Sequence, residues 1–105
     1  MSAYYEVDIE VTNFKKGNQK KIVKAINEGA DWDKNHQYVA DEGINIVRTL
    51  TLYGGTGEEE FAEEIRDKVF TANGESCDIE VKMTCLEDLP YNTYSFSKEE
   101  KNYEN

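Results

Sequence analysis

The sequence predicts one α+β domain in which two helices alternate with four strands. Apolar and polar side chains alternate with a period of two near the start of the chain, in its middle and again after residue 75, whereas two intervening segments have helical periodicity. Glycines separate several of these segments. A chain of 105 residues has the size of a single domain, and its 38% hydrophobic content is sufficient for one core.

The first predicted strand runs from Tyr4 to Thr12. Because side chains of a strand point alternately to opposite sides, one side is apolar, with Tyr5, Val7, Ile9 and Val11. The other side is acidic, with Glu6, Asp8 and Glu10.

A helix is predicted from Asn18, a favourable N-cap, to about Glu28, with Gly29 at its end. Its apolar stripe is formed by Ile22, Val23 and Ile26. The acidic segment that follows has weak periodicity and a short predicted strand, Gln37 to Ala40.

A second strong strand is predicted from Ile44 to Tyr53. Arg48 falls on its apolar side, so we expect this residue where that side reaches solvent, or with its stem extending outward. The next helix has Thr56 and Glu59 at the spacing of a capping box, and Asn73-Gly74 ends it.

The last predicted strand, Ser76 to Cys85, repeats the alternation of the first. It places Cys77 and Cys85 about 26 Å apart, too far for a disulfide, and two free thiols indicate a reducing compartment. Beyond Pro90, we expect Tyr91, Tyr94 and Phe96 to lie against the domain as an extended tail.

This order of elements predicts a ferredoxin-like βαββαβ domain over residues 1–96, with a four-stranded antiparallel sheet, both helices on one face, and a charged, frayed tail over 97–105. The first and last strands are neighbours in that arrangement. Their polar sides then form one negative patch, interrupted by Lys82 and composed of Glu6, Asp8, Glu10, Asp78 and Glu80.

Net charge limits the partners. The chain carries a formal charge of -10 and has a pI near 4.5, which disfavours direct binding of nucleic acid or anionic lipid and favours basic surfaces. Five lysines cluster at the first helix, where a solvated helix face competes with phosphate binding as the interpretation: Lys15, Lys16, Lys20, Lys21 and Lys24. The absence of a long apolar run or a signal sequence predicts a cytoplasmic protein, with no membrane partner.

Several motifs are incomplete. Positions 1, 3, 5 and 12 of a calcium loop are matched by Asp31, Asp33, Asn35 and Glu42, but His36 replaces the required glycine and a strand follows instead of a helix. His36 has no recognisable nucleophilic partner, and the GGTG at residues 54–57 lacks the lysine of a phosphate-binding loop. No catalytic residue and no cofactor are therefore predicted.

The second half of the chain resembles a known family. The stretches EEEFAEEI at Glu58 to Ile65 and CDIEVKMTCLEDLPYNTYSF at Cys77 to Phe96 are similar to small phage- and plasmid-encoded proteins with a YubB-like ferredoxin-type domain. The resemblance implies that fold and an accessory role on mobile genetic elements. It implies no catalytic residues.

Charge and resemblance together predict a non-enzymatic inhibitor of a bacterial host's nucleic-acid-handling defence system, of the anti-CRISPR or anti-restriction type. The negative patch would occupy a basic site that otherwise holds phosphates, assisted by Glu59, Glu60, Glu63 or Glu64, with Tyr53 and Trp32 as anchors. A monomer and a homodimer both remain open. The alternative is a small ligand- or calcium-binding module that uses residues 31–42.

Overall fold

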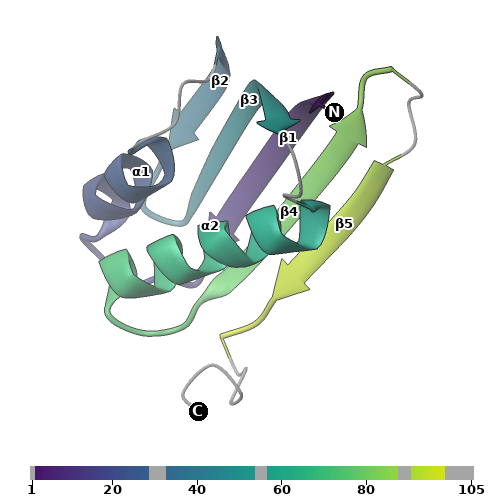
Figure 1. The fold of residues 1–105 in the computed structure, drawn as a ribbon. Coiled ribbons are helices and arrows are strands. Elements are labelled where there is room, and N and C mark those ends of the chain that lie inside the picture. Colours follow the sequence, from purple (N-terminus) through teal and green to yellow (C-terminus); the bar gives the residue numbers. More distant parts are fainter. Residues whose placement is uncertain (1, 29–32, 54–56, 88–90, 99–105) are drawn as a thin grey trace.

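The computed structural model describes residues 2–28, 33–53, 57–87 and 91–98. This part of the chain forms one antiparallel sheet with strand order β2-β3-β1-β4-β5 and two helices (Figure 1). In chain order, the elements are β1 (Ser2–Thr12), α1 (Gln19–Asn27), β2 (Asp33–Val39), β3 (Gly43–Tyr53), α2 (Glu58–Asn73), β4 (Asp78–Cys85) and β5 (Tyr91–Phe96).

The predicted four-stranded ferredoxin-like sheet is wrong, because the sheet has five strands. The segment expected to be an extended tail is β5, which pairs with β4 from Thr84 opposite Tyr91 to Ile79 opposite Phe96. Aromatic and hydroxyl side chains suit a pleated strand, and Tyr94 and Phe96 pack against the core from it. The edge of β4 is therefore covered by the chain's own C-terminal region.

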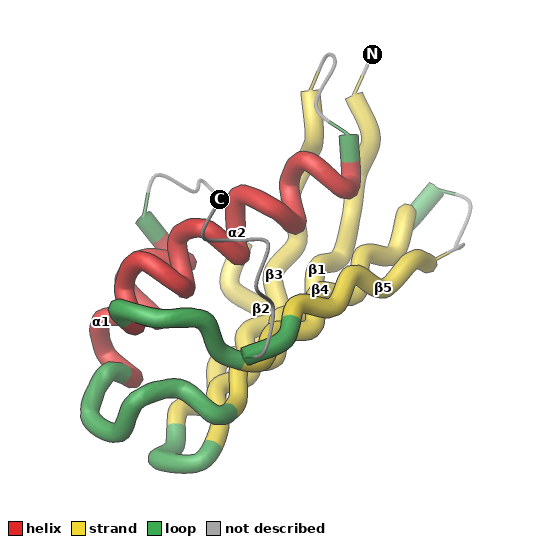
Figure 2. The backbone as a smooth tube through the Cα atoms, turned by 90° about the horizontal axis from the view of Figure 1, so that it is seen from below, coloured by secondary structure: helices red, strands yellow, loops and turns green. Residues whose placement is uncertain are grey.

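β1 is the central strand and determines the two faces of the sheet. It pairs with β3 on one side and with β4 on the other, both antiparallel. Figure 2 shows both helices on the same side of the sheet. The fully buried side chains of Val7, Ile9 and Val11 pack into the core on that side, so the opposite face of β1 is left uncovered by α1 and α2.

The ends of the helices are joined by an asparagine pair. Asn18 precedes α1 without capping it through its side chain; its Nδ2 instead donates to the carbonyl oxygen of Asn73 at 2.9 Å. Asn73 is buried, and its Oδ1 accepts from the backbone N–H of Lys15 at 2.8 Å. Gly74, with φ of 81°, ends α2 as predicted and donates to the carbonyls of Phe70 and Thr71. The predicted N-cap Thr56 and the predicted helix end Gly29 lie outside the described residues.

Arg48 is buried, contrary to the prediction that it reaches solvent. Its side chain is 2% exposed. One guanidinium nitrogen donates to the carbonyls of His36 and Val47, and the other to Gln37 Oε1 at 2.8 Å and Asn27 Oδ1 at 3.2 Å. The prediction failed because Asn27 of α1 and the residues His36 and Gln37 of the neighbouring strand β2 supply acceptors around the guanidinium. Burial lowers the pKa of Arg48 from its ordinary value.

Both cysteines are free thiols, as predicted, and burial raises the pKa of Cys77 to about 12. Among the described residues, neither helix has the length and apolarity required to cross a membrane.

Candidate functional site

The candidate site is the sheet face turned away from α1 and α2, which we call the open face. Strand register aligns its side chains in rows across the sheet. One row contains Tyr38, Asn45, Glu10, Glu80 and Ser95, and the next contains Val47, Asp8, Lys82 and Thr93. A third row contains Thr49, Glu6, Thr84 and Tyr91. The predicted neighbouring acidic rows of the first strand and the Asp78–Cys85 strand are thus present.

Among the described residues, three exposed carboxylates of the open face have no partner. Glu6, Glu10 and Glu80 make no hydrogen bond or ion pair with any described residue. Glu10 and Glu80 occupy directly opposite positions on β1 and β4. Like charges in opposite positions repel and reduce stability, so this part of the surface is not optimised for folding alone.

The remaining charges in the middle of the open face are partly satisfied. Asp8 is half-buried and accepts a hydrogen bond from Asn45 Nδ2 at 2.6 Å. Lys82 is opposite Asp8 in the register, but its ammonium group lies over the ring of Tyr91, 4.6 Å from the centroid. Lys82 therefore offsets the negative charge of the face without pairing with Glu6, Glu10 or Glu80.

Asp78 has a structural role that the sequence did not indicate. Its two carboxylate oxygens accept from the backbone N–H of Lys98 at 2.7 Å and from Asn13 Nδ2 at 2.5 Å. These two hydrogen bonds, with that of Lys98 the stronger influence, lower the pKa of Asp78. Asp78 thus fastens the chain after β5 to the turn after β1, and it is less available to a partner than Glu10 or Glu80.

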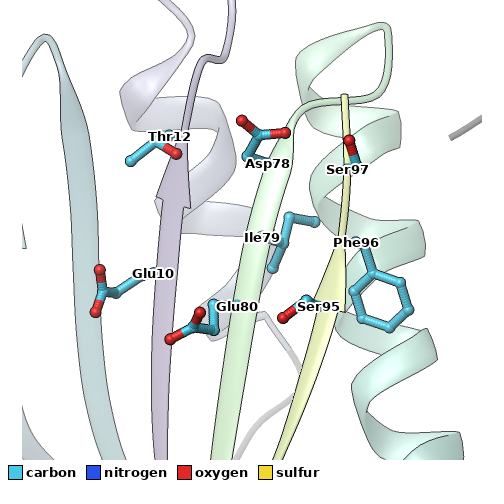
Figure 3. Close-up of a pocket in the computed structure, with 8 residues that line it drawn as sticks. All are labelled: Glu10, Thr12, Asp78, Ile79, Glu80, Ser95, Phe96 and Ser97. Atoms are coloured by element: carbon cyan, nitrogen blue, oxygen red, sulfur yellow. The ribbon is translucent and has the colours of Figure 1, made fainter. Parts of the chain in front are cut away.

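A shallow hollow of about 320 Å³ lies at this end of the open face. Figure 3 shows Glu10 and Glu80 on neighbouring strands in the hollow, with Asp78 nearer the strand ends. Its lining residues are Glu10, Thr12, Asp78, Ile79, Glu80, Ser95, Phe96 and Ser97. The hollow is a part of the open face in which carboxylates and apolar surface occur together.

Exposed tyrosines surround the carboxylates, and the sequence prediction missed them as anchors. Tyr4, Tyr38 and Tyr91 are 43%, 54% and 62% exposed. The register places them opposite Thr51, Asn45 and Thr84 of the open face. For Tyr4, the period-two alternation with Glu6 was sufficient to indicate this position. Of the predicted anchors, Trp32 lies outside the described residues, and so does the side chain of Tyr53.

The four predicted helix carboxylates do not join the open face. They belong to α2, on the other side of the sheet (Figure 2). Glu59, Glu60 and Glu64 are exposed there, and Glu63 is half-buried. The lysine cluster is also on the helix side, with its members exposed on α1 and the turn before it.

Glu58 begins α2 and forms a polar cluster that the sequence prediction missed. Its carboxylate accepts from Tyr5 Oη at 2.8 Å, Asn92 Nδ2 at 3.0 Å and Tyr94 Oη at 3.1 Å. Burial, then the hydrogen bond to Glu58, raises the pKa of Tyr5 to about 12, and the same causes raise the pKa of Tyr94. The cluster joins β1, α2 and β5 and is structural.

The segment with the partial calcium-loop spacing, which is the alternative site, has a different backbone conformation. Residues Asp33–Val39 form β2, which pairs with β3 and has an irregularity between Lys34 and His36. A paired strand cannot wrap its ligands around one ion as a calcium loop does. Asp31 and the side chains of Asp33 and Asn35 lie outside the described residues, and Glu42 is exposed. The described residues contain no group of three potential metal ligands.

Comparisons with protein-family models, curated proteins and solved structures found no match. The resemblance to YubB-like proteins therefore stays a prediction.

Proposed function

We propose that this protein binds a basic surface of a nucleic-acid-binding protein through its open face, and that it thereby excludes the nucleic acid. The observation that carries the proposal is the set of three exposed carboxylates, Glu6, Glu10 and Glu80, which have no partner in the described part of the chain and lie on a face that α1 and α2 leave uncovered. In its specific form, the protein is an accessory protein of a phage or other mobile element. It acts in the bacterial cytoplasm as an inhibitor of an anti-CRISPR or anti-restriction type.

The chemistry of the face fits such a partner. Lysine and arginine side chains that bind phosphates also bind carboxylates, to which they donate hydrogen bonds. Ion pairs with Glu10 and Glu80 would relieve the repulsion between these two carboxylates. Complementary charge chiefly raises the association rate and selects the partner. Slow dissociation requires buried anchors, and the exposed tyrosines Tyr4, Tyr38 and Tyr91 supply amphipathic rings for this purpose.

The proposed action is steric and electrostatic, with no chemical step. The hydroxyl groups of Tyr5 and Tyr94 already donate to Glu58. The thiol of Cys77 is buried, with a raised pKa that suppresses its thiolate. These three groups lie on the core side of the sheet, so none of them belongs to the open face.

Capture of partners from a bacterial lysate at low and high salt tests the proposal. The test variant replaces Glu6, Glu10 and Glu80 with glutamine. Its matched control makes the same replacements at Glu59, Glu60 and Glu64 on α2, which changes the net charge equally.

We expect the intact chain and the control to retain a basic nucleic-acid-binding protein at low salt, and the open-face variant to lose it. The captured protein should bind nucleic acid less well when the intact chain is added. Equal loss of capture in both variants would mean that net charge alone is responsible. Retention of no such protein at low salt would refute the proposal.

A further inference from the structure

The outer edge of β5 carries backbone groups that no described strand pairs with. β5 is the last strand in the sheet order, so no described strand pairs with its outer edge. The backbone N–H of Leu86 donates to the carbonyl of Tyr4 at 2.9 Å, which fixes the alternation of hydrogen bonds across the sheet. Because Leu86 and the even-numbered residues of β4 direct their backbone groups toward β1, the odd-numbered residues of β4 direct theirs toward Asn92, Tyr94 and Phe96 of β5. The backbone N–H and C=O groups of Tyr91, Thr93 and Ser95 therefore point outward.

This edge lacks the usual features that prevent strand pairing. β5 has the sequence YNTYSF, with no charged residue, proline or glycine, and its register with β4 is regular. The opposite edge, β2, has Asp33 and Lys34 and an irregularity between Lys34 and His36. Charges and bulges on an edge strand discourage pairing with another chain. Only β5, of the two described edges, is suited to it.

β5 is also held firmly in place. Asn92 and Tyr94 both donate to Glu58, and the guanidinium of Arg66 lies over the ring of Phe96, 5.2 Å from its centroid. Beyond the strand, the N–H of Lys98 donates to Asp78. A rigid edge loses little conformational freedom when another strand pairs with it, which favours association.

We infer that β5 pairs antiparallel with β5 of a second copy, around a two-fold axis at Thr93, and that the two sheets become one of ten strands. In this register Thr93 faces its counterpart, and Tyr91 faces Ser95, so every outward-directed residue finds an uncharged partner with free backbone groups. A heterologous strand would need to match these positions, whereas a second copy does so by symmetry.

The inferred dimer is independent of what the open face binds, but it enlarges that face. An axis perpendicular to the sheet keeps both pairs of helices on one side, so the two open faces become one surface. Salt distinguishes the two interactions. Because each chain carries a net charge of -10, screening strengthens the dimer, whereas it weakens binding to a basic partner.

Light scattering over a concentration series tests the inference. We expect the intact chain to approach twice its mass of 12.1 kDa and to do so more readily at higher salt. Thr93→Glu places two carboxylates at the two-fold axis, where they repel each other. Within one chain, position 93 is opposite Lys82, so the new carboxylate has a favourable neighbour and the fold is retained. This variant should remain a single chain with an unchanged far-UV circular dichroism spectrum.

A charge exchange identifies the occupant. Thr93→Lys should also weaken the dimer, and an equimolar mixture with Thr93→Glu should restore a species of double mass. Oxidation of Thr93→Cys should give a covalent dimer, because the Cα atoms of opposed residues in a hydrogen-bonded antiparallel pair are about 5.5 Å apart. Oxidation of Tyr38→Cys, on the opposite edge strand, should give none. A single-chain mass at every concentration, or a dimer that Thr93→Glu leaves intact, would overturn the inference. A third result would also overturn it: the intact chain is monomeric, and Thr93→Glu no longer binds a protein that the intact chain captures. That result would assign the edge of β5 to a strand of the partner.

Discussion

Glu10 on β1 and Glu80 on β4 occupy directly opposite positions in the sheet, and both are exposed. Repulsion between them weakens the folded state, so Glu80→Gln should stabilise it by a few tenths to about 1 kcal/mol. Thermal unfolding at low salt measures this gain. It should shrink at roughly 1 M salt, where the screening length is about 3 Å.

Glu87→Gln, in the exposed turn after β4, is the control and should change stability little. A second substitution, Glu10→Gln, should add almost nothing to Glu80→Gln, because the repulsion has already been removed. Full additivity of the two gains would contradict the account.

Arg48 is buried among neutral oxygen acceptors, and its removal takes away their charged donor. Arg48→Met retains an unbranched stem of similar reach but removes the hydrogen bonds to Asn27 Oδ1 and to the carbonyl of His36, whereas Gln37 Oε1 still accepts from Asn27 Nδ2 at 3.3 Å. We expect the free energy of unfolding to fall by roughly 2 to 4 kcal/mol. Urea denaturation measures the loss, and Lys24→Met on the exposed side of α1 should change it by less than about 0.5 kcal/mol. Equal effects of the two substitutions would show that the guanidinium contributes nothing specific.

Burial of the Tyr5 hydroxyl, together with its hydrogen bond to Glu58, predicts a loss of stability at alkaline pH. The pKa of Tyr5 is raised from 10.0 to about 12 in the folded state, so its contribution is complete below pH 10. As pH rises through this interval the unfolded chain loses its proton first, and the contribution disappears. The melting temperature should therefore decline from about pH 10 upward.

Tyrosinate absorbance checks the same cluster. Glu58→Gln should lower the pKa of Tyr5 only in part, since burial is the larger cause of the shift. The variant Tyr4→Phe removes an exposed tyrosine, and its absorbance change is compared with that of the intact chain. Titration of Tyr5 near pH 10 in the intact chain would contradict both its burial and its hydrogen bond to Glu58.

Asp78 predicts a loss of stability on the acid side. Its pKa is lowered in the folded state, so its contribution is present above the ordinary value of 3.8 and is lost as pH falls through the folded-state pKa. Asp78→Asn should reduce stability at neutral pH and flatten its acid dependence, because one amide nitrogen then faces Asn13 Nδ2, which is itself a donor. Thermal unfolding at pH 7 and at pH 3 measures both effects. An unchanged acid dependence would contradict the role given to Asp78.

The sequence was sufficient to predict the strands and the helix whose apolar residues have a strong periodicity. β1, β3 and β4 were predicted within a few residues because each buries one whole side, and α2 because Gly74 marks its end. β5 was not predicted as a strand, since an edge strand of six residues needs few apolar side chains. For the same reason, only part of β2 was identified.

The candidate site was predicted in part. The acidic side of β1, with Glu6, Asp8 and Glu10, followed from the alternation of side chains alone. The roles of Arg48 and Glu58 did not, because their partners Asn27 and Tyr5 are 21 and 53 residues away in the sequence. Only the tertiary structure shows that Arg48 points inward and that Glu58 is fully engaged.

The central position of β1 also affects how the protein folds during synthesis. This strand is made first, yet its neighbours are β3 and β4, so it must wait for Gly43–Tyr53 and then for Asp78–Cys85. Such distant pairing is slow, and both edges of a strand with one apolar side stay open meanwhile. Charged residues within such a segment oppose aggregation. Glu6, Asp8 and Glu10 are placed to oppose aggregation of the nascent chain before the sheet has formed.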